Sequence, residues 1–235
     1  MAEDNKGFLY ERKINADLKK YKVYPGGYSG AGSDSNAPDA FIRVNNKDLK
    51  VEVKLDMKVD FGQGSLDYDL KNKKWILGGA QTQSAIQMRK FLESIKVPNI
   101  VNKAWGSKGP PRKFTVPFEK YTKQDVAYDY KNFTDTFVNI SNSAVSNYYN
   151  SKNTYYIQIG DGYGLYYMGK DIAKLGVKPF FPTLKLRIRL KRGGSSPIYN
   201  YRFSTAIQAA TNSLSKSNSD LDDILFLKGL GARNL

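Results

Sequence analysis

The chain has 235 residues, with 37 Lys and Arg against 22 Asp and Glu, which gives a formal net charge of +15. It contains no cysteine and no histidine, so disulfides, thiolate chemistry, histidine general bases and nearly all zinc sites are excluded. Any catalysis must therefore use carboxylates, Lys, Tyr, Ser or Thr, and the metal that such residues favour is a hard cation on oxygen ligands. The positive charge predicts a polyanionic partner, chiefly nucleic acid or an anionic membrane; the alternative is a protein that is merely rich in lysine and has no such partner.

The length suits one large domain or a core with an appended lobe. We expect a soft boundary near residue 120, where the chain becomes rich in Asn, Ser and Tyr, and so a division into 1–120 and 121–235. The N-terminus does not resemble a signal peptide, and no apolar run approaches membrane-spanning length. We expect an intracellular protein, and the Asn/Lys/Tyr-rich composition is compatible with an AT-rich genome such as that of a virus or phage, which would place it in the host cell.

The first half of the chain alternates between helical and strand-like periodicity. In chain order we expect an amphipathic helix at 8–20, a short strand at 22–24, a Gly- and Ser-rich loop at 25–36, strands at 39–44 and 49–55, a long helix at 80–96 and a strand at 114–116.

The second half predicts a helix and two hairpins. In chain order these are a helix at 133–149, a hairpin with strands at 154–159 and 165–168, a second hairpin with strands at 183–191 and 198–204, and a short helix at 221–230. This order predicts a mixed α/β fold with a hairpin-rich C-terminal lobe.

The first predicted hairpin carries a carboxylate–lysine group. If Val44 lies opposite Leu49 across a four-residue turn, Asp39 falls beside Lys54 at the open end. Side chains alternate along a strand, so Glu52 and Lys54 share one face. Two carboxylates and an ammonium group would then converge.

Such a group suits phosphodiester hydrolysis. Asp39 and Glu52 can hold Mg²⁺ or Mn²⁺ by oxygen, with the Val53 carbonyl as a further ligand. Lys54 can orient or deprotonate the attacking water and stabilise the transition state. The alternative is a salt-bridged, solvent-exposed strand face, because an acidic residue two positions before a lysine is frequent in this chain.

The context of the hairpin favours a site. Pro38-Asp39 is the one Pro-Asp step in the chain, and Glu11 lies on the preceding predicted helix. With Glu52-Val53-Lys54, this pattern resembles the PD-(D/E)XK, or restriction-endonuclease-like, nuclease superfamily over roughly residues 8–117. The resemblance implies a central mixed sheet flanked by helices, with metal-binding roles for Asp39 and Glu52 and a water-activating role for Lys54.

The resemblance implies further roles and properties. Glu11 would be the additional glutamate from the first helix, and Gln63 the glutamine after the second strand, although Gln81 and Gln83 compete for that role. Members of this family typically leave a 5′-phosphate, and many dimerise to cut both strands of DNA. An endonuclease is favoured over an exonuclease, since nothing in the chain indicates a motor or a processive ring.

Basic residues outside the motif predict contacts with nucleic acid. In the predicted strand 183–191, cations alternate with apolar residues, which places them about 6.6–6.8 Å apart on one face. The alternative is an exposed strand kept soluble by its charges. The residues that we predict to contact nucleic acid are Lys185, Arg187, Arg189, Lys191, Arg192, Arg202, Lys108 and Arg112.

Two other classes of function compete with a DNA nuclease. A non-enzymatic DNA- or RNA-binding protein would carry Asp39, Glu52 and Lys54 as surface charge. A peripheral membrane protein would need an amphipathic cationic helix, and none is predicted.

Overall fold

The computed structural model describes residues 5–25, 37–192 and 200–232. The chain forms two compact units, each built from separate segments: a first unit of residues 1–59, 141–183 and 209–235, and a second of 60–140 and 184–208. This division differs from the predicted boundary near residue 120, because the chain leaves the first unit twice and returns to it at residue 141 and again at residue 209. The Gly-rich stretch 26–36 and residues 193–199, which include the start of the strand predicted at 198–204, lie outside the described residues.

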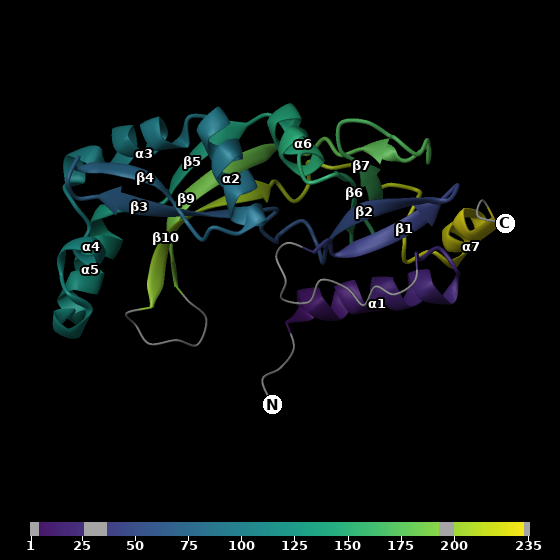
Figure 1. The fold of residues 1–235 in the computed structure, drawn as a ribbon, viewed down its shortest axis with the longest axis horizontal. Coiled ribbons are helices and arrows are strands. Elements are labelled where there is room, and N and C mark those ends of the chain that lie inside the picture. Colours follow the sequence, from purple (N-terminus) through teal and green to yellow (C-terminus); the bar gives the residue numbers. More distant parts are fainter. Residues whose placement is uncertain (1–4, 26–36, 193–199, 233–235) are drawn as a thin grey trace. The chain divides into compact units, whose positions relative to one another are not determined.

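The first unit is a five-stranded mixed sheet with helices packed on it (Figure 1). Its strand order is β1-β2-β6-β7-β8, with β1 antiparallel and β6 parallel to β2. Its elements are α1 (Lys6–Lys20), β1 (Ala40–Val44), β2 (Lys47–Lys54), α6 (Asn142–Asn150), β6 (Thr154–Ile159), β7 (Gly164–Tyr167), β8 (Lys178–Pro179) and α7 (Ile224–Ala232).

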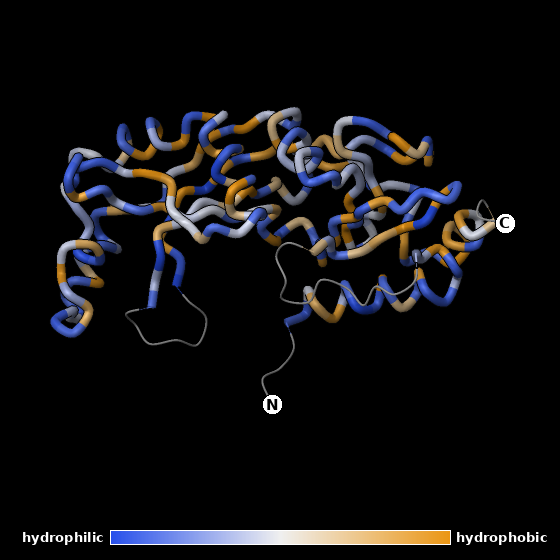
Figure 2. Tube along the Cα trace, in the orientation of Figure 1, coloured by the Kyte–Doolittle hydropathy of each residue, from blue (hydrophilic) through white to orange (hydrophobic). Residues whose placement is uncertain are grey.

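The core of the first unit lies between its sheet and α1. Ile14 and Leu18, one turn apart on α1, are fully buried in the same apolar cluster as Val51 and Val53 of β2. Leu227 and Leu230 of α7 belong to this cluster, and Figure 2 shows α7 as a largely hydrophobic helix. Because β2 alternates, burial of Val51 and Val53 directs Glu52 and Lys54 to the opposite face.

The hairpin of β1 and β2 has a tighter turn than the sequence predicts. Asn45 and Asn46 both have positive φ, 50° and 58°, as a two-residue type I′ turn requires. Ile42 therefore pairs with Leu49, where the predicted register paired it with Val51. The register thus differs from the prediction by two residues, and the side chains keep their predicted faces because the strand period is two.

The second unit is a five-stranded sheet of order β4-β3-β10-β9-β5, with α2 packed against β3 and β4 and α3 against β4. Its largest buried side chains form an aromatic cluster in which the Trp75 ring contacts Trp105, Phe133 and Phe203 edge-on. Its elements are β3 (Gln63–Asp69), β4 (Lys74–Gly78), α2 (Gln83–Ser94), α3 (Val97–Trp105), α4 (Arg112–Thr115), α5 (Lys123–Asn132), β5 (Thr136–Ile140), β9 (Leu184–Arg192), β10 (Tyr201–Ala209) and short 3-10 turns at Gly106–Lys108 and Phe118–Lys120.

Three predicted elements are wrong. The strand predicted at 114–116 falls largely in the short helix α4. The first two N–H groups of this helix donate hydrogen bonds to the buried carboxylate of Asp129. The helix predicted at 133–149 is the strand β5 followed by α6, because Ser141 caps a new helix by accepting the Ala144 N–H. The strand predicted at 22–24 is a turn, in which Lys22 has φ 59°.

The mixed α/β class is confirmed, as are the strands of both C-terminal hairpins, where β6 neighbours β7 and β9 neighbours β10. Gln63, which the sequence placed after the second strand, is the first residue of β3. None of the helices that the structure describes is both long and apolar enough to cross a bilayer.

The Asn45-Asn46 turn yields a stability prediction. Replacing Asn46 by Val places a β-branched residue at positive φ, which should lower the free energy of unfolding by about 1–2 kcal/mol. Asn46→Gly, which adopts this conformation freely, should leave the stability unchanged or raise it. Urea denaturation of the two variants checks this, and equal destabilisation by both would contradict the turn assignment.

Candidate active site

The structure brings together the three residues of the predicted site. The Lys54 ammonium nitrogen lies 2.6 Å from Glu52 Oε1 and 3.7 Å from Asp39 Oδ2. All three side chains are largely shielded, with 13–18% of their surface exposed. The exposed strand face that the sequence left open as an alternative would not shield these groups in this way.

Asp39 is held in place by the backbone of β2. Its Oδ2 accepts the Val53 N–H at 2.8 Å, just beyond the last pair of the β1–β2 ladder, Ala40 with Val51. The N–H and C=O groups of one strand residue point to the same edge of the strand. The Val53 carbonyl therefore faces the Asp39 side, where it was predicted to contribute a ligand.

The helix α1 contributes Glu11 and its neighbour one turn later, Asn15. The Asn15 side-chain amide donates hydrogen bonds to the backbone carbonyl oxygens of Glu11 and Asp39, both at 2.9 Å. The second of these bonds links α1 to the residue that precedes β1. The Asn15 Oδ1 is buried and has no hydrogen-bond partner within the described residues. Glu11 is half-buried and close enough for its charge to interact with those of Asp39 and Lys54.

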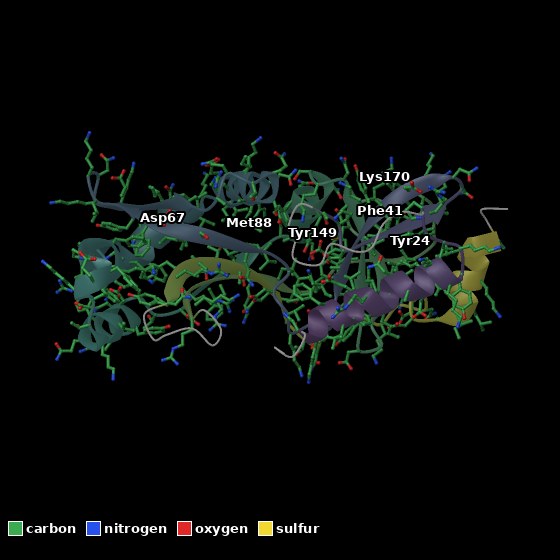
Figure 3. All side chains as sticks on the ribbon, turned by 60° about the horizontal axis from the view of Figure 1, so that its bottom comes forward. Tyr24, Phe41, Asp67, Met88, Tyr149 and Lys170 are labelled. Atoms are coloured by element: carbon green, nitrogen blue, oxygen red, sulfur yellow. The ribbon has the colours of Figure 1, made fainter. Side chains whose placement is uncertain are left out.

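The helix α6 and the turn that follows it supply two residues that the sequence did not indicate. The fully buried Tyr149 (labelled in Figure 3) places its hydroxyl 3.5 Å from Glu52 Oε1. The ammonium group of Lys152, in the turn between α6 and β6, lies 5.4 Å and 5.5 Å from the ring centres of Tyr148 and Tyr149. These residues are about a hundred positions from Glu52, and no local sequence pattern indicates them, because they reach the site through the parallel pairing of β6 with β2.

The electrostatics of the cluster are those of carboxylates removed from water. Burial, then the Glu52 charge, raises the pKa of Asp39 to about 6, and burial, then the Asp39 charge, raises the pKa of Glu11 to about 7. Burial alone would raise the pKa of Glu52, but the Lys54 and Lys152 ammonium groups outweigh it and lower that pKa.

Lys54 is a cation in this environment. Burial alone would lower the pKa of its ammonium group, but the Glu52 and Asp39 carboxylates outweigh this effect and raise the pKa. A protonated Lys54 can orient a water molecule and stabilise negative charge. It cannot accept a proton, so the general-base role is disfavoured.

The donor atoms at this end of β2 fit a hard divalent cation. The Asp39 and Glu52 carboxylates and the Val53 carbonyl are oxygen ligands of the kind that Mg²⁺ and Mn²⁺ prefer. Within residues 5–25, 37–192 and 200–232, however, no three acidic side chains form a ready metal-binding group, and Lys54 bridges the carboxylates instead. A cation would be held by the same atoms that now contact Lys54.

The predicted glutamine lies in the second unit. Gln63 donates its amide to Asp60 at 2.8 Å and accepts from the Lys191 ammonium group at 2.7 Å. Gln81 and Gln83 also belong to that unit, and Gln81 accepts from Arg89 at 3.2 Å. The catalytic role of Gln63 stays a prediction.

The predicted basic row lies on β9, which is an interior strand between β10 and β5. Two of its arginines are held by carboxylates: Arg187 Nε lies 2.7 Å from Asp135 Oδ2, and Arg189 Nη2 lies 2.6 Å from Asp60 Oδ2. Lys185 is exposed. The positive charge of this row is therefore partly neutralised by Asp135 and Asp60, which the sequence pattern of β9 alone does not indicate.

The remaining predicted nucleic-acid contacts are exposed side chains of the second unit. They are Arg192 at the end of β9, whose guanidinium lies 5.9 Å from the Tyr130 ring centre, Arg202 on β10, Lys108 in a 3-10 turn, and Arg112 at the start of α4, 4.7 Å from the Tyr128 ring centre. Their contacts with nucleic acid stay predictions.

The raised pKa of Glu11 predicts a pH-dependent gain in stability for Glu11→Gln. A raised carboxyl pKa means that folding favours the protonated form, so this group's contribution to stability falls as the pH rises from about 4.5 to about 7. After allowance for partial solvent screening, we expect the variant to be about 1–2 kcal/mol more stable than the unmodified chain at about pH 8, and nearly equal to it at about pH 4.

Denaturant unfolding at the two pH values measures this difference. Glu119→Gln, at an exposed position of the second unit, removes the same charge and should change stability little at either pH. A stability difference for Glu11→Gln that is independent of pH would contradict the assignment.

A solved structure described as HhaI endonuclease in complex with DNA is similar to this chain, with a TM-score of 0.47 and 12% sequence identity over 94% of this chain and 95% of that one. No protein-family model matches the chain, and no curated protein matches it.

Proposed function

We propose that the chain is a metal-dependent nuclease that hydrolyses phosphodiester bonds of DNA at the Asp39–Glu52–Lys54 cluster. The observation that carries the proposal is the convergence of two shielded carboxylates and one ammonium group at the end of β2. A net charge of +15 supports a polyanionic substrate. An endonuclease is the form of the activity that we favour.

Asp39 and Glu52 would hold Mg²⁺ or Mn²⁺, together with the Val53 carbonyl. The cation, when bound, would acidify water and neutralise charge on the phosphate. Binding of a cation needs an ionised Asp39 carboxylate, so the raised pKa of that carboxyl favours activity above about pH 6. Both carboxylates are paired with the Lys54 ammonium group. A divalent cation must therefore compete with Lys54 for the same carboxylate oxygens.

The other groups of the cluster have distinct tasks. Lys54, held in its cationic form, orients the attacking water and stabilises the negative charge that develops on the phosphate. Tyr149 donates a hydrogen bond to Glu52, and its raised pKa keeps the phenol protonated, which fixes the carboxylate orientation. Lys152 adds a second positive charge beside the carboxylates, in a position to attract a phosphate oxygen.

Loss of cleavage in site variants tests the proposal. With supercoiled plasmid and Mg²⁺, Asp39→Asn and Lys54→Met should each lower the cleavage rate by about 100-fold or more, since each removes a group that acts on developing charge. Glu119→Gln is the control for a change of charge away from the cluster. Gel analysis of nicked and linear products, with an EDTA arm, measures the rates.

The competing function is binding of nucleic acid without cleavage. Equal nicking by the unmodified chain and by both site variants would attribute the activity to a contaminant. Absence of nicking in every sample, together with gel-shift binding, would establish the non-enzymatic binder and reject the nuclease.

Lys152 yields a separate prediction. Lys152→Met should lower the cleavage rate about 10-fold and raise the half-saturating DNA concentration, because a phosphate contact is lost while the carboxylates remain. Lys170→Met, at an exposed position of the same unit, should leave both values unchanged. Equal kinetics for the two variants would remove Lys152 from the site.

A further inference from the structure

The strand β5 carries a large aromatic side chain on its open face. Phe137 is 51% exposed, whereas its neighbours Thr136 and Val138 are half-buried. β5 is an edge strand of the second sheet, and Phe137 pairs directly with Arg187 of β9. The ring therefore stands on the same sheet face as the basic row of β9.

Two cations flank this ring. The Lys185 ammonium group lies 4.6 Å and the Arg187 guanidinium carbon 5.9 Å from the ring centre. Arg187 is fixed by its hydrogen bond to Asp135, whereas Lys185 is exposed. The result is an aromatic surface with one anchored and one solvent-accessible cation beside it.

This combination is poorly explained by solubility alone. Charged residues on an exposed strand protect it from association, but an exposed Phe on an edge strand works against that protection. An apolar protein partner would cover the ring at the cost of desolvating Lys185 and Arg187. A ligand that offers both an aromatic ring and a negative charge matches all three side chains.

We propose that Phe137, with Lys185 and Arg187, binds a single-stranded segment of nucleic acid by stacking on an unpaired base and contacting the adjacent phosphate. An aromatic side chain can stack on an unpaired base, whereas bases inside a duplex are stacked on one another and are not accessible. The inference rests on the nucleic-acid binding of the proposed function and is independent of cleavage.

Binding assays in EDTA isolate this contact, because cleavage is then absent. Fluorescence anisotropy compares a labelled 12-nucleotide single strand with a duplex of the same sequence. Phe137→Leu keeps the apolar bulk and removes the aromatic face, and should weaken single-strand binding by about 5–10-fold with duplex binding unchanged. Phe118→Leu, at a position that is 80% exposed in the same unit, should change neither.

A second variant tests the phosphate contact. Lys185→Met should weaken single-strand binding and reduce the slope of log affinity against log salt by about 0.7, the value for one phosphate contact on a single strand. Circular dichroism and thermal melting confirm that each variant is folded.

Unchanged single-strand affinity in Phe137→Leu, or an equal loss on single strand and duplex, would overturn the inference. If the unmodified chain still nicks plasmid with Mg²⁺ in that case, the proposed function stands and only the stacking surface fails. Absence of binding to both DNA forms would overturn the inference and the nucleic-acid part of the proposed function together.

Discussion

The ion pairs of Lys54 with Glu52 and Asp39 are the interactions that hold the candidate site of the first unit together. A shielded ion pair is weak evidence for stability, since desolvation of both partners offsets their attraction. Here two of the carboxylates near Lys54 have raised pKa values, so their ionised forms are disfavoured by folding. A group that costs stability and yet is held by α1, β1, β2 and α6 is better explained by function than by packing.

The hairpin shows how far local sequence patterns reach. The alternation of apolar and polar residues predicted both strands and the sheet face on which Asp39, Glu52 and Lys54 lie. The predicted register was wrong by two residues, but the faces stayed correct because side chains alternate with a period of two. The error itself came from the turn: Asn45 and Asn46 close it alone, since Asn tolerates positive φ. The resemblance to PD-(D/E)XK nucleases added roles for these residues but no geometry.

Contacts between distant segments were not predictable in the same way. Tyr149 and Lys152 reach Glu52 only because β6 lies parallel to β2, and no local pattern encodes a parallel partner about a hundred residues away. The alternation of apolar and basic residues in β9 correctly predicted its two faces. It did not predict that Arg187 and Arg189 form ion pairs with Asp135 and Asp60. The helix predicted at 133–149 failed because tertiary pairing of β5 overrode a weak local preference.

The interleaving of the two units along the chain has a consequence for biosynthesis. The first unit needs segments from residues 1–59, 141–183 and 209–235, so its sheet can close only after β8, at Lys178–Pro179, has left the ribosome. The hairpin of β1 and β2 would meanwhile expose its edge and the charged end that later carries the cluster. We therefore expect slow, late folding, in which removal of α7, whose Leu227 and Leu230 belong to the core of this unit, disrupts a cluster formed mainly by residues 39–54.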